Sequence, residues 1–358
     1  MKKKYVLMLA FMMPLCATAP AFAQPVQPQP AQVQAGFADL VEKLSPAVVN
    51  ISTTQKVKAA QGYFGMPFEG LPNTPEFEPF RQFFDRFGGQ MQQQEREVFS
   101  LGSGFIIDAE GHVITNNHVV AEADEVAVTL SDNRKFTAET IGRDPKTDLA
   151  LLKIKDAKAF PYVPLGDSDA MRVGDWVIAI GNPFGLGGSV TQGIISARQR
   201  SINAGPFDDF LQTDAPINRG NSGGPLFNTK GEVIGINSAI FSPSGGSVGI
   251  GFAIPTALAK PIVEQLKAQG HVVRGWLGVK IQEVTDEIAE SIGLGTAKGA
   301  LIMDVSAGSP AEKAGLKTGD IVVSFNGKEI REMRFLPRMV AETKIGSSVT
   351  LGYWRDGK

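Results

Sequence analysis

The stretch from residue 99 to residue 255 consists of short runs of apolar and β-branched residues separated by turn-forming residues. The runs are GFIID, HVITNNHVV, EVAVTL, LALLKI, WVIAIG, SVTQGIIS, EVIGINSAI and GIGFAIP. Many short strands at close spacing are typical of a β-barrel or a β-sandwich. We therefore expect a mainly β fold here, and this pattern restricts the architecture more than any other feature of the chain.

Helices are expected on both sides of this β region. Apolar residues at helical spacing predict a short helix that ends before Pro46. Residues 256–269 also read as a helix, which Pro261 is expected either to kink or to begin. A chain of 358 residues, 43% of them hydrophobic and 20% charged, has a globular composition and is long enough for two domains. We expect the first domain to span residues 37–270.

Within the first domain, residues 57–98 are predicted to form a long insertion. The segment contains glycine, proline and glutamine but also many phenylalanines, which disordered linkers usually lack. We expect a mobile insertion whose phenylalanines dock on another surface. The alternative is a flexible loop with a few core contacts.

The N-terminal residues 1–23 have the three parts of a secretory signal. Lys2–Lys4 supply the positive charge, Tyr5–Leu15 the apolar segment and Ala21–Ala23 the small-residue cleavage motif. The apolar segment is too short to span a bilayer comfortably. Residues 24–36, rich in proline and glutamine, are expected to be a flexible leader. The mature chain is thus predicted to be exported.

Composition excludes several classes of function. The single cysteine, Cys16, lies in the expected signal, so the mature chain has no disulfide and no catalytic thiol. The net charge of −2 supplies no basic field for nucleic acid. Only three histidines are present, without a closely spaced pair, so we expect no metal site and no cofactor. No segment after the signal reads as a transmembrane helix.

Residues 271–358 read as a second, smaller domain with both helices and strands. A serine–proline pair at residues 309–310 predicts a helix start, with Gly315 as its stop. An asparagine–glycine pair at residues 326–327 predicts a hairpin turn after the strand DIVVSF. A further helix is expected at RFLPRMVAE and a last strand at VTLGYW. Because no other strand follows, we expect an unpaired edge and a domain truncated at its C-terminus.

One serine, Ser222, lies in a run of small residues, INRGNSGGPLF. Glycine is costly to order, so Gly220, Gly223 and Gly224 are expected where the backbone turns tightly or is closely approached. One interpretation is an ordinary surface turn. The other is a nucleophile, with the backbone N–H groups of Gly220 and Ser222 forming an oxyanion hole. Each donor of such a site contributes roughly 10²–10³ in rate.

The order of three candidate residues favours the nucleophile. His118 lies at the end of a β run, Asp148 directly precedes an apolar strand, and Ser222 follows, at separations of 30 and 74 residues. Any one of them alone is more often structural. A histidine–aspartate–serine order on an all-β background is that of the chymotrypsin class. In its mechanism His118 is the general base, Asp148 orients the imidazole and Ser222 is the nucleophile.

A competing interpretation treats GNSGG as the nucleophile elbow of an α/β-hydrolase. That elbow requires a helix directly after the serine and a histidine last in the sequence. Here two glycines, a proline and the strand-like PLFN follow Ser222, and the only later histidine is His271, near the domain boundary. The elbow is therefore disfavoured.

These motifs carry a family resemblance. TNNHVV, TDLALLKI and QTDAPINRGNSGGPLFN resemble the catalytic motifs of the HtrA/Deg family of bacterial periplasmic serine endoproteases. RGWLGVKI and SPAEKAGLKTGDIVVSFNGKEI resemble its PDZ domain. The resemblance covers about residues 37–358. It implies a chymotrypsin-like double β-barrel protease domain followed by an α+β PDZ domain.

The resemblance also implies what such a chain does. It implies degradation of unfolded or misfolded envelope proteins in the periplasm, PDZ capture of substrate C-termini, chaperone-like holding and a trimer-based assembly. It places Ile217, Ile240 and Phe241 along an apolar pocket for the residue before the scissile bond. The loop that captures a peptide's C-terminal carboxylate is expected to consist of Trp276, Leu277, Gly278 and Val279.

Two alternatives of other classes stay open. The first is a binding protein with a peptide-capturing PDZ domain on an inert barrel, against which the intact set of His118, Asp148 and Ser222 argues. The second is a holdase whose proteolysis is secondary. Sequence does not separate it from a protease, because holding and cutting would use the same chain.

Overall fold

The computed structural model describes most of both expected domains. The described residues are 36–57, 96–156, 158–181, 188–202, 204–218, 220–243 and 246–358, without the side chains of 56–57 and 96–100. The expected signal, the leader up to residue 35 and almost all of the phenylalanine-rich insertion lie outside them. The expectations for these segments stay predictions.

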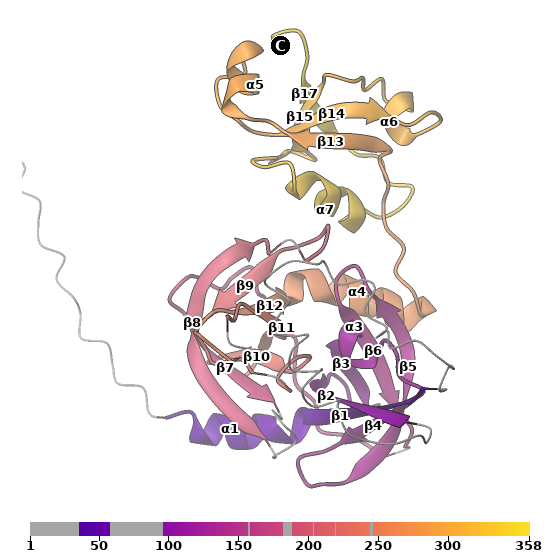
Figure 1. The fold of residues 1–358 in the computed structure, drawn as a ribbon, viewed down its shortest axis with the longest axis vertical. Coiled ribbons are helices and arrows are strands. Elements are labelled where there is room, and N and C mark those ends of the chain that lie inside the picture. Colours follow the sequence, from indigo (N-terminus) through magenta and orange to yellow (C-terminus); the bar gives the residue numbers. More distant parts are fainter. Residues whose placement is uncertain are drawn as a thin grey trace, which may run out of the picture. The chain divides into compact units, whose positions relative to one another are not determined.

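Six strands close into a first antiparallel barrel in the order β1-β2-β3-β6-β5-β4 (Figure 1). They are β1 (Val48–Val57), β2 (Arg96–Ile106), β3 (His112–Asn116), β4 (Glu125–Thr129), β5 (Lys135–Asp144) and β6 (Leu149–Ile154). Fully buried side chains such as Ile51, Leu152 and Ile154 fill its interior. The sequence pattern predicts neither β1 nor β5, because both strands carry many polar residues.

Six more strands close into a second antiparallel barrel in the order β10-β11-β12-β9-β8-β7. They are β7 (Trp176–Gly181), β8 (Ser189–Arg200), β9 (Phe210–Thr213), β10 (Pro225–Asn228), β11 (Val233–Ile240) and β12 (Gly251–Pro255). Its core includes the fully buried Val177, Leu226 and Ile234. Two closed six-stranded barrels confirm the chymotrypsin-like fold that the resemblance implied.

One predicted strand is shorter than expected. The run HVITNNHVV is a strand only as far as Asn116, and Asn117–Val120 form the short helix α3. Val119 and Val120 of this helix are buried in the core of the first barrel. These valines are apolar because they pack a helical turn into the core. A short apolar run in a sequence does not show whether it forms a helical turn or a strand.

Helices lie at both ends of the first domain. The helix predicted before Pro46 is α1 (Ala38–Leu44), continued by the 3₁₀ turn η1 (Ser45–Ala47). The second is α4 (Thr256–Gln269), which contains Pro261, so the alternative that the helix begins at this proline is wrong. It packs against β5 and β6 of the first barrel and against β11 and β12 of the second.

A partly buried ionic cluster joins α4 to the first barrel. Asp108 accepts a hydrogen bond from Lys267 Nζ at 2.9 Å, and its Oδ2 lies 2.8 Å from Nδ1 of His112. Burial raises the pKa of Asp108, but the hydrogen bonds from Lys267 and His112 outweigh it and lower the pKa to about 2. With Glu110 the cluster has enough ligand atoms for a cation, but Lys267 already supplies a positive charge there.

Replacing Asp108 is expected to destabilise the fold in a pH-dependent way. The pKa is about 2 in the folded protein and 3.8 in an unperturbed aspartate, so folding favours the carboxylate. Its contribution is present above about pH 4 and is lost as the pH falls towards 2. The Asp108→Asn variant should lose about 2 kcal/mol of unfolding free energy at pH 7 and about half of that at pH 3. Urea unfolding at both pH values measures this, and a loss that does not vary with pH contradicts it.

The second domain is a five-stranded sheet with three helices. The strands are β13 (Val279–Glu283), β14 (Ala300–Val305), β15 (Ile321–Phe325), β16 (Lys328–Glu329) and β17 (Leu351–Trp354), and the helices are α5 (Asp286–Ser291), α6 (Pro310–Lys313) and α7 (Phe335–Glu342). The last strand, β17, pairs with β15, so the expectation that it lacks a partner is wrong. Its partner comes from earlier in the chain, not from a strand that follows it.

The turn and cap signals of this domain are confirmed. The side chain of Ser309 accepts a hydrogen bond from the backbone N–H of Glu312 and so caps α6, and Gly315 has a φ of 78° just after that helix. Asn326 and Gly327 have φ values of 48° and 76° in the turn that joins β15 to β16. Positive φ at both positions is the geometry of a tight hairpin turn.

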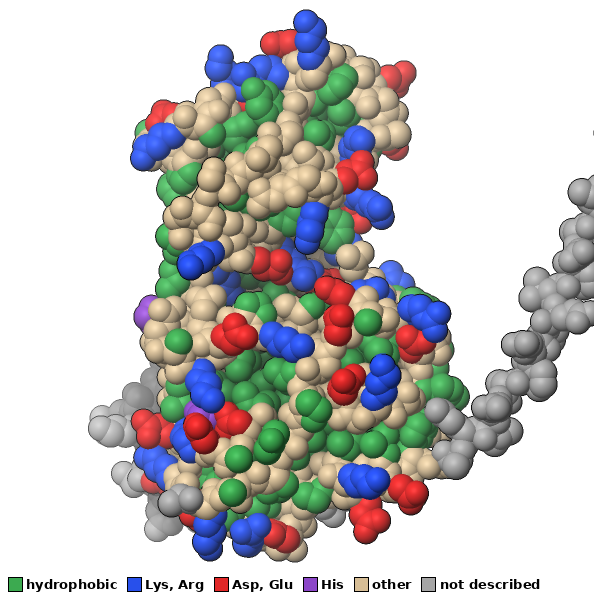
Figure 2. All heavy atoms as spheres, turned by 180° about the vertical axis from the view of Figure 1, so that it is seen from behind, with side chains coloured by type: hydrophobic (Ala, Val, Ile, Leu, Met, Phe, Trp, Pro, Cys, Tyr) green, Lys and Arg blue, Asp and Glu red, His purple; other side chains and the backbone are tan. Residues whose placement is uncertain are grey.

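The surface mixes both signs of charge. On the face shown in Figure 2, basic and acidic side chains are interspersed instead of gathering into one patch. The chain as a whole has 35 basic and 37 acidic residues. Within the described ranges, no helix combines the length and the apolar character needed to cross a membrane.

Candidate active site

The three predicted catalytic residues lie where strands begin or end. His118 is in α3, directly after β3, and Asp148 directly precedes β6, the neighbour of β3 in the first barrel. Ser222 lies in the turn before β10 of the second barrel. Asn116, the last residue of β3, pairs with Leu149, the first residue of β6. The residues that follow Asn116 therefore lie close to Asp148, which precedes Leu149.

His118 and Asp148 contact each other directly. Nδ1 of His118 lies 2.7 Å from Oδ2 of Asp148, and the backbone N–H of His118 donates to Oδ1 at 2.9 Å. An ionised carboxylate only accepts hydrogen bonds, so this contact assigns the ring proton to Nδ1 and leaves Nε2 free to accept one. The His118 side chain is 50% exposed, so the ring is accessible to a ligand.

Asp148 has an unusual backbone conformation. Its φ is 57°, a left-handed value that costs a non-glycine residue roughly 1–2 kcal/mol. Its carbonyl oxygen accepts two hydrogen bonds, from the backbone N–H of Asn117 at 3.0 Å and from Nδ2 of Asn116 at 2.9 Å. A hydrogen bond contributes about 1 kcal/mol net, so the two together offset the cost of this conformation.

The turn that carries Ser222 is tied to the first barrel through Ser103 of β2. The backbone N–H of Ser103 donates to the carbonyl of Ser222 at 2.9 Å, and its hydroxyl donates to the carbonyl of Gly220 at 2.5 Å. Thr115, near the end of β3, donates its hydroxyl to the carbonyl of Ser103 at 2.8 Å. The nucleophile candidate is therefore held against β2, and Thr115 links that strand to β3, which leads to His118.

A fourth residue, Ser238 of β11, joins the site. Its hydroxyl donates to Oδ2 of Asp148 at 2.8 Å, and its carbonyl oxygen lies 3.5 Å from the hydroxyl of Ser222. It thus connects the aspartate of the first barrel with the serine of the second. The sequence at this position indicates only an ordinary strand. In the structure, Ser238 is the first partly buried residue after the fully buried start of β11.

The glycines around Ser222 serve both the turn and the contact between barrels. Gly220 and Gly223 have φ values of 91° and 82°, which favour glycine. A Cβ atom on Gly223 would lie 2.3 Å from the carbonyl oxygen of Ser103 and from the hydroxyl of Thr115. In the part of the chain that the structure describes, no hydrogen bond occupies the backbone N–H of Gly220 or of Ser222. Their role as the donors of an oxyanion hole stays a prediction.

The nucleophile elbow does not fit the structure. The strand β10 follows Ser222 where the elbow requires a helix. His271, the histidine that the elbow would need, lies beyond α4, and its Nδ1 contacts the carbonyl oxygen of Gln269. The structure places His118 against Asp148 and links Asp148 to Ser222 through Ser238, and among the described residues no hydrogen bond joins His118 to Ser222 directly.

The residues expected along the substrate pocket differ in burial. Ile217 is buried, and Ile240 packs partly buried against the same core cluster of the second barrel. Phe241, directly after β11, is 52% exposed. The two isoleucines thus pack in one apolar cluster, the ring of Phe241 is exposed at the surface, and their role as a substrate pocket stays a prediction.

The expected carboxylate-binding loop opens the second domain. Trp276 is 63% exposed, Leu277 is buried, and Val279 begins β13. Gly278 has a φ of 81°, and a Cβ atom there would lie 2.3 Å from Cβ of Ser309. Glycine is therefore required where this loop passes the cap of α6.

Comparisons with known proteins agree with this geometry. The family model of the trypsin-like peptidase domain matches residues 102–236, and that of the PDZ domain matches residues 275–358. Proteins described as probable periplasmic serine endoproteases, DegP-like, are 49% identical in Bartonella henselae and 48% identical in Brucella melitensis. The matches cover 91% and 96% of this chain, and 66% and 71% of those proteins. The chain belongs to the HtrA/DegP-like family of serine endoproteases.

Solved structures support the same assignment. The HtrA-type protease AlgW with a decapeptide is 43% identical, with a TM-score of 0.71, and the match covers 90% of this chain and 96% of that one. A serine endoprotease from Yersinia pestis is 34% identical, with a TM-score of 0.60, over 91% and 96% of the two chains. The enzyme class of this HtrA-type chain is therefore serine endopeptidase.

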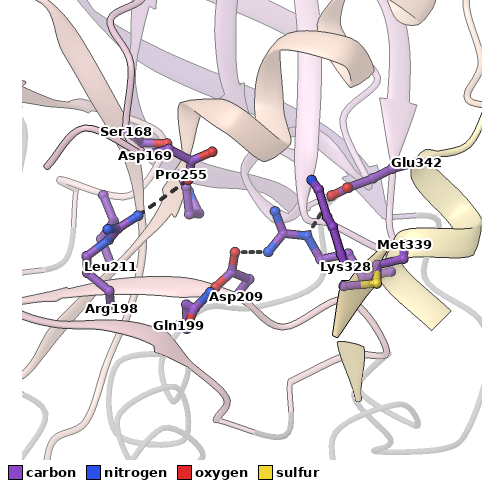
Figure 3. A pocket seen from close by; sticks show the side chains of 11 residues that line it. Ser168, Asp169, Arg198, Gln199, Asp209, Leu211, Pro255, Lys328, Met339 and Glu342 are labelled. Atoms are coloured by element: carbon purple, nitrogen blue, oxygen red, sulfur yellow. Dashed lines mark hydrogen bonds and ion pairs between the residues drawn. The ribbon is translucent and has the colours of Figure 1, made fainter. Parts of the chain in front are cut away.

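One pocket of this HtrA-type protein lies apart from the triad. It has a volume of about 220 Å³ and is lined by none of the predicted site residues (Figure 3). Arg338 of α7 forms an ion pair with Asp209, and Arg198 lies 3.4 Å from Asp169. Because these charges pair with one another, the pocket offers no dominant charge to a substrate and does not compete with the region of Ser222 as an active site.

Proposed function

We propose that this chain is an exported serine endopeptidase that degrades unfolded or misfolded envelope proteins. The observation that supports it most is the contact of His118 with Asp148, together with the link from Asp148 through Ser238 to Ser222. Through these contacts a base, a carboxylate that can orient it and a hydroxyl, which come from separate segments of the chain, belong to one hydrogen-bonded group. Acyl transfer by such a set needs no cofactor.

In the proposed mechanism, Oγ of Ser222 attacks the carbonyl carbon of the scissile bond while Nε2 of His118 takes the hydroxyl proton. Asp148 keeps the other ring proton on Nδ1 and stabilises the imidazolium. The backbone N–H groups of Gly220 and Ser222 receive the oxyanion. The C–N bond then breaks, and His118 gives its proton to the leaving amine. Water repeats the sequence on the acyl-enzyme and releases the new C-terminus.

The PDZ domain is proposed to capture the C-termini of substrates. The loop from Trp276 to Val279 leads directly into β13, which lies at the edge of the sheet in the described residues. An edge strand has unpaired backbone groups to which an extended peptide adds as a further strand. The exposed ring of Trp276 supplies apolar surface beside that strand. Unfolded chains present extended termini of this kind.

Periplasmic location, holding of unfolded protein and trimer-based assembly complete the proposal. The signal-like residues 1–23 and the relatives described as periplasmic endoproteases support export. Holding and assembly rest on the family resemblance. Chaperone-like holding is measured separately from proteolysis as binding of an unfolded chain without its cleavage.

A fluorophosphonate probe tests the proposed chemistry. The probe reacts with a serine that a general base activates, so mass spectrometry should find it on Ser222 in the wild-type protein and not in a His118→Ala variant. Turnover of unfolded casein is measured in parallel. A protein that binds casein but neither takes up the probe nor cleaves would favour a binding module on an inert barrel.

Cleavage is expected mainly after medium-sized aliphatic residues. Ile217 and Ile240 supply an apolar wall, and Pro216 occupies the position six residues before Ser222, where an acidic residue would attract lysine or arginine. A charged side chain against this wall would lack compensation. Mapping the peptides released from unfolded casein measures the preference, and a majority of cuts after lysine or arginine would refute it.

A further inference from the structure

Asn116 is fully buried, yet only one end of its amide has a partner. Nδ2 donates to the carbonyl of Asp148 at 2.9 Å, whereas Oδ1 has no hydrogen-bond partner among the described residues. A buried acceptor without a partner lowers stability. Stability alone therefore does not account for an asparagine at this position. The feature that distinguishes it is the hydrogen bond that its Nδ2 donates to Asp148.

The donor end acts on the backbone of Asp148. The carbonyl there accepts one hydrogen bond from the backbone N–H of Asn117, which extends the β3–β6 ladder beyond the pair of Asn116 with Leu149. Any residue except proline at position 117 supplies that bond. The second hydrogen bond requires a donor side chain at position 116 that reaches the same oxygen.

We propose that Asn116 is a positioning residue, whose amide holds the carbonyl of Asp148 and so fixes the left-handed turn that directs the carboxylate to His118. The inference rests on the proposed function, because it concerns the aspartate of that mechanism. Asn116 itself touches neither substrate nor reacting atoms. The carboxylate of Asp148 receives two hydrogen bonds from His118 and one from Ser238, so a rotation of its backbone disturbs all three.

The Asn116→Leu variant separates positioning from stability. Leucine has a similar shape but removes both the donor and the unpartnered acceptor, so the melting temperature should be unchanged or higher. The value of kcat on a short peptide should fall about 10- to 100-fold, the range expected when a catalytic group moves by up to about 1 Å. KM should change less than about twofold, because Asn116 makes no contact with substrate.

A second readout does not depend on turnover. The chain has only three histidines, so ¹⁵N-histidine labelling gives a simple spectrum. In a Ser222→Ala background, His118 should carry its proton on Nδ1, and addition of Asn116→Leu should produce a mixture with the Nε2–H form. If the protein proved not to cleave peptides, this spectrum would still test the positioning of Asp148.

Asn228→Ala is the matched control. This asparagine of β10 is also buried, but it donates to Glu232 at 2.8 Å and accepts from the backbone N–H groups of Lys230 and Glu232 in a turn. Its loss should lower stability and leave kcat and the His118 spectrum unchanged. The proposal is overturned if Asn116→Leu keeps the wild-type kcat or the wild-type tautomer, if it fails to fold, or if Asn228→Ala lowers kcat equally.

Discussion

The Ser222→Ala variant is expected to fold normally and to hydrolyse peptides about 10⁴- to 10⁶-fold more slowly than the wild-type protein. The substitution removes the nucleophile itself. It costs little stability, because among the described residues the hydroxyl of Ser222 makes one hydrogen bond, to the carbonyl of Ser238 at 3.5 Å, which is the limit of a hydrogen bond. Rates on a short peptide and on unfolded casein, with a melting curve, measure both parts of the expectation.

A serine outside the site supplies the control. Ser131 is exposed in the turn between β4 and β5, and Ser131→Ala should change neither rate nor stability. The Ser222→Ala protein should still bind unfolded casein, because the PDZ loop is intact. Cleavage by purified Ser222→Ala protein within a hundredfold of the wild-type rate would show that another residue is the nucleophile.

The Asp148→Asn variant is expected to keep its fold and to lose about 10⁴-fold in kcat. Asparagine tolerates positive φ better than most residues, so the φ of 57° at this position can stay as it is. The carboxylate accepts three hydrogen bonds, from His118 N–H, His118 Nδ1–H and Ser238. An amide has one oxygen and one N–H₂ group, so at least one donor would face another donor. The imidazole would then carry its proton on Nε2 and could not accept that of Ser222.

Ser238→Ala gives a graded comparison for the same carboxylate. It removes one donor and leaves both contacts of His118, so kcat should fall only about tenfold, the equivalent of one hydrogen bond. Steady-state kinetics on one peptide, with the ¹⁵N spectrum of His118, measures both variants. An Asp148→Asn enzyme within tenfold of wild type would mean that Asp148 does not set the tautomer.

The residue types that carry the proposed chemistry are recognisable in the sequence. A base, a carboxylate and a hydroxyl cannot be exchanged for other residues without losing their roles, and the glycines next to Ser222 mark a backbone that must pass close to another. The order of His118, Asp148 and Ser222 on a strand-rich background then indicates the class of mechanism.

The residues that support these three are not recognisable in the sequence. Ser238 lies 90 residues from Asp148 and Asn116 lies 32 residues from it, yet both donate to it. Serine and asparagine occur widely in strands and turns, so nothing local separates these two from others of their type. Only the closure of the barrels and the packing of one against the other brings them to the aspartate.

The same division holds for the fold. Apolar runs such as LALLKI and WVIAIG indicate buried strands from the sequence, because turn residues flank them and they are too short for a typical helix. Polar strands such as β5 and the pairing of β17 with β15 were decided by tertiary structure. These segments form strands only when a neighbouring strand, distant in the sequence, pairs with their backbone N–H and C=O groups. Residues close in the sequence do not provide these partners. The sequence by itself thus indicated the candidate catalytic residues and many of the core residues, and long-range pairing decided how they meet.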